Sequence, residues 1–88
     1  EIAIKMASMM RQMAKHHQVI SISHLPQIAA RGEAHYFVYK DNSADKAISS
    51  IRQLSDEERI TEIAKMIGGD QPSAVAFESA RELMRANA

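Results

Sequence analysis

Four histidines carry the side chains best suited to proton transfer or metal binding in this 88-residue sequence: His16, His17, His24 and His35. No two of them stand four residues apart and no HExxH pattern occurs, so the spacing that places two imidazoles on one helix face is missing. The sequence also lacks cysteine, which excludes a disulfide, a thiolate nucleophile and a thiolate zinc site. We therefore expect no native metal site.

His24 has the most favourable position for chemistry. It follows Val19 to Ser23, a short and mostly β-branched segment that predicts a buried strand, parallel to a neighbouring strand. Pro26 then suits the first turn of a following helix. Open α/β sheets bind ligands beyond the carboxyl ends of their strands, where an imidazole could accept a proton, donate to a phosphate oxygen or orient a water. A structural histidine that caps the turn is the alternative, and spacing alone leaves both open.

Other catalytic signatures are weak. Gly68-Gly69 follows a predicted helix and favours a helix end rather than a phosphate cradle, and neither GxxxxGK[ST] nor GxGxxG occurs. Asp56, Glu57 and Glu58 are explained as first-turn charges of a helix rather than hydrolase carboxylates. The basic residues are scattered with few aromatics between them, which is typical of a solvated face rather than a nucleic-acid groove: Lys5, Arg11, Lys15, Arg31, Arg52, Arg59, Arg81 and Arg85.

The elements that must position these residues follow from periodicity and caps. Residues 1–15 predict a helix whose apolar stripe we expect to pack in the core, with a partner-binding groove as the alternative. That stripe consists of Ile2, Met6, Met9, Met10 and Met13. Ser55 and Glu58 have the spacing of a capping box and predict the start of a later helix.

The whole pattern predicts a mixed α/β chain in the order α-β-α-β-β-α-α, forming a single unit over residues 1–88. The expected elements, in chain order, are helix 1–15, strand 19–23, helix 26–30 ending near Gly32, strand 35–40, a hairpin partner within 46–54 after a polar turn at 41–45, a helix from Ser55 that ends at Gly68-Gly69, and a last helix after residues 70–72.

The composition of the chain argues against some classes of protein. Eleven basic and eleven acidic residues give zero net charge, which argues against a protein that holds DNA by its overall field, although a local basic face stays possible. No apolar run approaches the ~20 residues that span a bilayer, so we expect no membrane partner. The first residues already have the pattern of a helix interior, with no cap before them and no initiator Met. We therefore expect a piece of a longer protein.

Three ordered motifs and a short closing segment carry a resemblance to a known family. Residues 19–29 (VISISHLPQIA) resemble a "QV-x-x-[ST]-H-L-P-Q-[IV]-A" segment, and residues 35–40 (HYFVYK) resemble an "H-Y-F-V-x-K" strand. Residues 59–69 (RITEIAKMIGG) resemble an "R-x-x-E-[IL]-A-[RK]-[ML]-[IL]-G-G" helix, and residues 80–83 (AREL) resemble an "A-[KR]-E-[LM]" closing segment. These motifs are similar to those of the RecN family of bacterial DNA repair proteins, and the resemblance covers roughly residues 18–85, with compatible gaps between the motifs.

The resemblance implies a fold and an activity. RecN proteins are SMC-like ATPases of recombinational double-strand-break repair, and this chain would be the C-terminal part of their P-loop, ABC-class head. By position in the motif, His24 would be the switch, or H-loop, histidine, which contacts the γ-phosphate of ATP and serves hydrolysis. Residues 1–15 would be the helix that follows the D-loop of the family.

The resemblance also implies what the chain lacks. The family's Walker A, Q-loop, signature and Walker B segments would all lie upstream of residue 1, so the 88 residues alone are expected neither to bind ATP tightly nor to hydrolyse it. ATP and Mg²⁺ would be bound by the intact protein, with a second ATPase head and DNA as partners in the bacterial cytoplasm, at the nucleoid. Residues 19–23 would lose their neighbouring strand, and the exposed edge would be covered either by self-association or by a rearrangement of the N-terminal helix.

A second function stays open at this point. The methionine stripe and the C-terminal helices could instead dock a protein partner, which would make the chain a non-enzymatic α+β interaction module.

Overall fold

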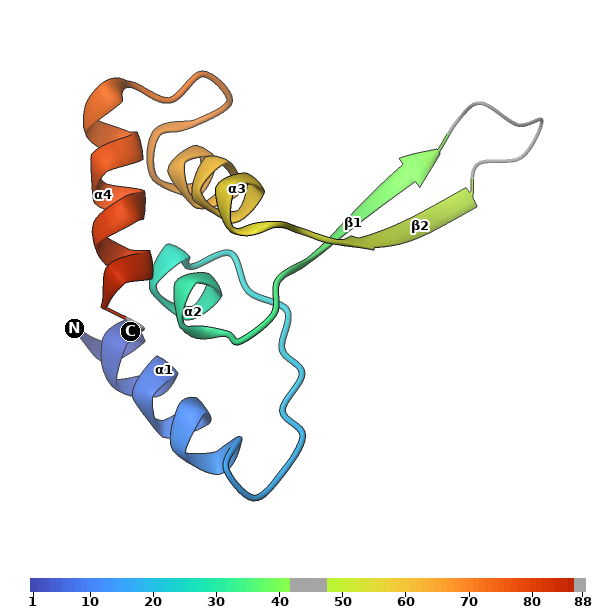
Figure 1. The fold of residues 1–88 in the computed structure, drawn as a ribbon, viewed down its shortest axis with the longest axis vertical. Coiled ribbons are helices and arrows are strands. Elements are labelled where there is room, and N and C mark those ends of the chain that lie inside the picture. Colours follow the sequence, from blue (N-terminus) through green and yellow to red (C-terminus); the bar gives the residue numbers. More distant parts are fainter. Residues whose placement is uncertain (42–47, 87–88) are drawn as a thin grey trace.

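The computed structural model describes residues 1–41 and 48–86. Their elements follow in the order α1 (Ile2–Met13), α2 (Pro26–Arg31), β1 (Tyr36–Asp41), β2 (Ile48–Gln53), α3 (Asp56–Gly68) and α4 (Ala74–Arg85). Figure 1 shows α2, α3 and α4 gathered together, with α1 beyond α2 and the β1–β2 hairpin extending away from the helices. The mixed α/β class is confirmed.

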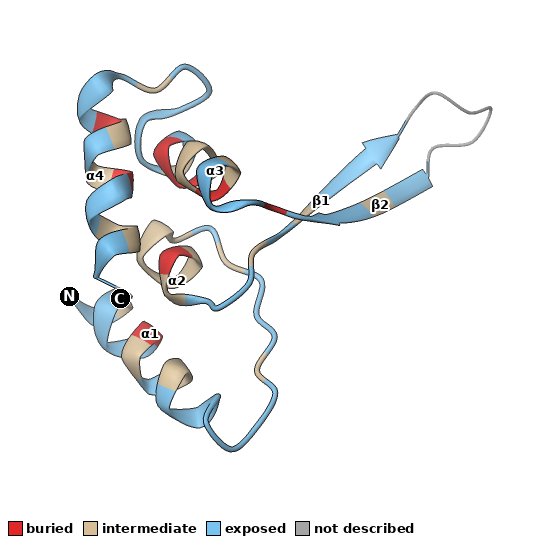
Figure 2. Ribbon diagram, viewed as in Figure 1, coloured by how far each residue is buried: buried red, intermediate tan, exposed pale blue. Residues whose placement is uncertain are grey.

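The core lies between α2, α3 and α4. Ile63 and Ala64 of α3 are fully buried, Ala80 of α4 belongs to the same cluster, and Ala30 of α2 completes it. The red segments of Figure 2 mark these positions on the inward faces of the three helices. Mostly small side chains fill this core, so the helices can approach closely while little apolar surface is buried.

Local signals define both C-terminal helices. The hydroxyl of Ser55 accepts from the backbone N–H of Glu58, and the Glu58 carboxylate accepts from the backbone N–H of Ser55, so the predicted capping box is confirmed. Gly69 has a φ of 88°, a conformation that suits glycine, at the predicted end of α3. Ser73 caps α4 through the backbone N–H of Ala76.

The predicted hairpin is present as a two-stranded antiparallel sheet. Val38 of β1 lies opposite Ile51 of β2, and both are exposed. Leu54 is buried where the hairpin joins the helices, and its backbone N–H donates to the carbonyl of His35 at 2.8 Å. Of the predicted turn at 41–45, residues 42–45 lie outside the described residues.

The predicted strand at residues 19–23 is wrong for this structure. The segment forms no strand, and the described sheet contains only β1 and β2. Ile20 and Ile22 are 83% and 102% exposed. A strand needs a neighbour to receive its backbone hydrogen bonds, and no described segment lies beside this one to do so. The observed order is therefore α-α-β-β-α-α.

The expected core role of the methionine stripe is also wrong for this structure. Met6, Met9 and Met13 of α1 are between 47% and 65% exposed and Ile2 is 76% exposed, whereas Met10 is partly buried and Ala7 is 2% exposed. Among the described elements α1 packs against α2, and its face around Ala7 makes that contact. A small residue permits the close approach, which turns the longer apolar side chains toward solvent.

Candidate functional site

His24 lies in the connection between α1 and α2, one residue before the N-cap of α2. Its side chain is exposed, and no hydrogen bond or ion pair joins it to another of the residues that the structure describes. The predicted site residue is thus accessible on the surface. The sequence predicted that His24 stands at the carboxyl end of a strand. That prediction is wrong for this structure, because residues 19–23 form no strand here.

The backbone on the C-terminal side of His24 is held in place. The Ser23 hydroxyl accepts from the backbone N–H of Leu25 at 3.0 Å, which makes a local turn around His24. Pro26 occupies the first turn of α2, where its missing N–H costs nothing. The residue before a proline favours extended backbone, and Leu25 has φ −100° and ψ 122°. His24 is therefore presented at a defined helix start.

A buried arginine anchors the other end of α2. Arg59 of α3 is 5% exposed, and its guanidinium donates to the carbonyls of Ala29 at 3.2 Å and of Gly32 at 2.7 Å. A helix end leaves carbonyls without partners, and Arg59 supplies donors to them. The helix that follows His24 is therefore fastened to the core through α3. The expectation that Arg59 is solvated is wrong, and its position on the Ile60–Ile63 side of the helix was the only signal to the contrary.

The other histidines do not join His24 in a site. His16 and His17 are exposed after α1, and His35 is partly buried before β1. Burial lowers the pKa of His35 below its usual value, the positive charge of Arg59 lowers it further, and Glu62 acts in the opposite direction. In the described part of the chain, no three His, Asp or Glu side chains gather as metal ligands.

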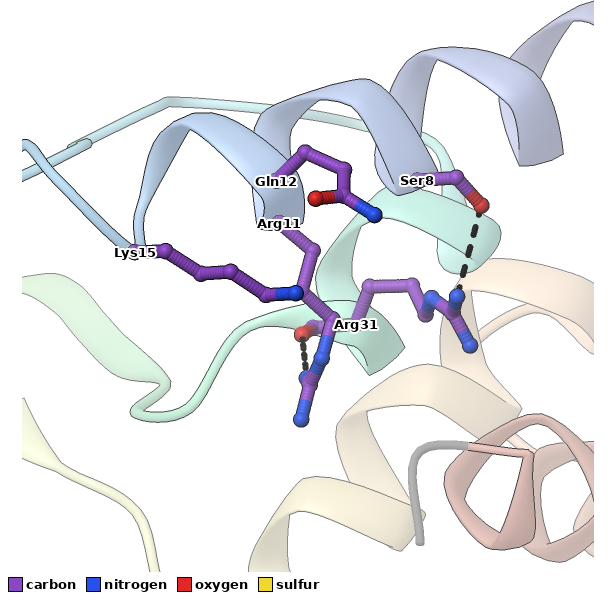
Figure 3. Close-up of a pocket in the computed structure, with 5 residues that line it drawn as sticks. All are labelled: Ser8, Arg11, Gln12, Lys15 and Arg31. Atoms are coloured by element: carbon purple, nitrogen blue, oxygen red, sulfur yellow. Dashed lines mark hydrogen bonds between the residues drawn. The ribbon is translucent and has the colours of Figure 1, made fainter.

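A basic cleft between α1 and α2 was not anticipated. Its volume is about 290 Å³, and Ser8, Arg11, Gln12, Lys15 and Arg31 line it (Figure 3). The first four stand at i, i+3, i+4 and i+7, which is one face of a helix. That polar spacing is the signal that could have revealed the cleft, although the basic residues as a whole are scattered along the sequence.

Comparison with known proteins bears on the whole chain. No protein-family model matches it. It is 38% identical over 88 residues, all of its length, to the DNA repair protein RecN of Treponema pallidum (strain Nichols). It is 42% identical to RecN of Deinococcus radiodurans over 82 residues, which is 93% of the chain. The chain is homologous to the C-terminal region of RecN.

The chain matches only a small part of each RecN protein. The chain spans 15% of the length of the Treponema RecN and 14% of the Deinococcus RecN. The resemblance to RecN that the motifs carried is confirmed. Among the described residues, no helix is long and apolar enough to cross a membrane.

Proposed function

We propose that this chain supplies the switch histidine, His24, to the ATPase head of a RecN-type protein that acts in recombinational repair of DNA double-strand breaks. The observation that carries the proposal is the exposed His24 at the start of α2, within a segment of RecN homology that covers the chain. An imidazole that serves a nucleotide bound elsewhere must be accessible, and this one is.

The chemistry suits an imidazole in this place. Phosphoryl transfer depends on positioning the nucleophile and on stabilising charge at the γ-phosphoryl oxygens, with little covalent assistance from the protein. In the proposed role, His24 donates a hydrogen bond to a γ-phosphoryl oxygen and orients the attacking water. The hydrogen bond from the Leu25 backbone N–H to the Ser23 hydroxyl restricts the backbone on both sides of His24, which lowers the entropy cost of placing its imidazole.

The nucleotide and its metal are assigned to other parts of the intact protein. ATP is the proposed substrate, and magnesium is the cation that its hydrolysis requires. In the part of the chain that the structure describes, no three His, Asp or Glu side chains gather as metal ligands. We therefore assign no step of this chain to the metal.

The proposed partners follow from the same function. A second ATPase head would complete the nucleotide site of the intact protein, and DNA would be its target. The proposed location is the bacterial cytoplasm, at the nucleoid. The 88-residue chain alone is not expected to bind ATP tightly.

The decisive experiment substitutes His24→Ala in the intact RecN-type protein. We expect ATP hydrolysis to fall by about 10²-fold or more, as expected for loss of a group that acts in the transition state, while ATP affinity changes little. His17→Ala removes another exposed imidazole, seven residues earlier in the sequence, and is the matched control, which should leave turnover unchanged. Equal turnover in the wild type and in the His24→Ala protein would refute the assignment.

A second measurement separates this role from a structural one. His24 is exposed and contacts no described side chain through a hydrogen bond or ion pair, so His24→Ala in the 88-residue chain should change the free energy of unfolding by no more than about 0.5 kcal/mol. Urea denaturation followed by circular dichroism measures this value. A loss of about 1 kcal/mol or more in the free energy of unfolding would favour the alternative, in which His24 is a structural residue that caps the turn.

A further inference from the structure

The β1–β2 hairpin joins the rest of the molecule at a narrow base. Figure 1 shows the hairpin extending away from the helices, and among the described elements no helix packs against either strand. At the base, the backbone N–H of Leu54 donates to the carbonyl of His35 at 2.8 Å. Arg52 of β2 also forms an exposed ion pair with Glu58 at 2.6 Å. The direction of the hairpin therefore depends on a few residues at its base.

His35 stands at this base, one residue before β1, and its side chain is partly buried. The Nδ1 atom of its ring is buried and has no hydrogen-bond partner among the described residues. In a neutral imidazole this nitrogen can be the one that carries no proton, whereas in the charged form both ring nitrogens are donors. Protonation in this position would therefore leave a charged group with a buried donor and no acceptor, which is unfavourable.

The charged groups that act on the His35 ring lie on α3. Arg59, which is 5% exposed, repels a positively charged imidazole, and Glu62 attracts one. Leu54, the neighbour of His35 across the hairpin base, carries no charge. Burial and Arg59 together outweigh Glu62, so the pKa of His35 is lowered from its usual value of 6.5. The buried position beside Arg59 therefore suits the neutral ring.

Glu62 offers the protonated ring a second position. Its carboxylate is partly exposed, and Lys65 lies 3.5 Å from it at the surface of α3. A charged imidazole that turns from Arg59 toward Glu62 exchanges a repulsion for an ion pair and regains contact with water. Because β1 begins at the residue after His35, this movement loosens the base from which the hairpin extends.

We propose that His35 is a pH-sensitive switch that sets the direction of the β1–β2 hairpin relative to the helices. The neutral imidazole packs at the hairpin base and holds the orientation seen in Figure 1. The protonated imidazole leaves its buried position and pairs with Glu62, and the hairpin then takes other orientations. The switch involves neither His24 nor ATP hydrolysis, so it stands or fails separately from the proposed function.

The test measures the distance between the hairpin and the helices as the pH changes. The chain contains no cysteine, so Lys40→Cys on β1 and Glu78→Cys on α4, both exposed, provide two unique sites for spin labels. Pulsed electron paramagnetic resonance should give a distance distribution that changes between about pH 8 and about pH 5.5. The midpoint of the change should lie below pH 6.5. A distribution that is the same throughout this range overturns the proposal.

Three variants of the labelled chain assign the change to His35. His35→Gln removes the titrating ring and should abolish the pH response, whereas His17→Gln removes an exposed ring and should keep it. Glu62→Gln removes the attraction to the protonated ring and should move the midpoint to lower pH. A response that survives in His35→Gln, or a midpoint that is unchanged in Glu62→Gln, contradicts the switch.

A second labelled pair separates the switch from acid unfolding of the whole chain. Glu57→Cys on α3 and Glu78→Cys on α4 are both exposed and lie within the helices. Their distance should stay constant over the same pH range, and a change parallel to that of the hairpin would contradict a local switch. If this distance shows that His35→Gln disturbs the fold, the midpoint in Glu62→Gln decides the proposal.

Discussion

Arg59 Nη2 donates to the carbonyl oxygen of Gly32 at 2.7 Å, and this contact joins two segments that are 27 residues apart in sequence. The same guanidinium donates to the carbonyls of Ala29 and Ala30, and at 3.5 Å to that of Glu33. A buried charge is unfavourable unless hydrogen bonds replace its hydration, and these carbonyls provide them. The contact fastens the C-terminal end of α2, the helix that follows His24, to α3.

We predict that Arg59→Met destabilises the 88-residue chain by about 2–3 kcal/mol. Methionine keeps much of the buried volume, so the loss reports the carbonyls of α2 that are left without donors. Urea denaturation followed by circular dichroism measures the change. The control is Arg85→Met, which removes an exposed pair with Glu82 and should cost less than about 1 kcal/mol. Equal losses in both variants would show that the buried contacts contribute nothing specific.

The stability of the chain should decrease as the pH falls below the usual pKa of histidine. Burial and the charge of Arg59 lower the pKa of His35 from 6.5 in the folded state, although Glu62 opposes them. The unfolded chain therefore binds a proton more readily than the folded chain, and protonation favours unfolding. This stability is complete above pH 6.5 and is lost as the pH falls through the folded pKa.

Thermal unfolding measured between about pH 8 and pH 5 tests this coupling. The His35→Gln variant should show a flatter dependence over that range, because it has no imidazole to titrate. His17→Gln, at an exposed position, is the control and should keep the wild-type slope. A His35→Gln profile that parallels the wild type would contradict the prediction. The Glu58 carboxyl does not interfere, because its hydrogen bonds from Ser55 and Arg52 hold its pKa below 4.5.

Self-association through residues 19–23 is the third prediction. Ile20 and Ile22 are exposed, and the backbone around them pairs with no described strand. Extended backbone with apolar side chains can pair with the same segment of a second copy. Light scattering after size exclusion should therefore show dimers or larger species that increase with concentration.

The double variant Ile20→Lys and Ile22→Lys should shift the chain toward the monomer, because it places charges along the exposed segment. Val38→Lys changes an exposed β1 residue in the same way and serves as the control. A wild-type chain that stays monomeric at high concentration would contradict the prediction. So would a control variant that disperses the oligomer equally well.

Much of the local structure could be predicted from the residues themselves. The capping box of Ser55 and Glu58, the end of α3 at Gly69 and the β1–β2 hairpin all lie where their patterns indicated. These features depend on groups within a few residues of one another, or on two adjacent strands. The predicted strand at 19–23 is absent because a strand needs a neighbour for its backbone hydrogen bonds, and the described sheet contains only β1 and β2.

The residues alone predicted the mixed α/β class, the Ser55–Glu58 capping box and the motif around His24, because each depends on short-range chemistry. Which helix faces meet became clear only from the packing of the helices in three dimensions. Ala7 is buried on α1 while Met6, Met9 and Met13 are exposed, Arg59 is buried at the end of α2, and Arg11 donates to the carbonyl of Arg31. The physical reason is that burial and charge proximity depend on the packing of distant segments, and periodicity within one helix does not specify its partner.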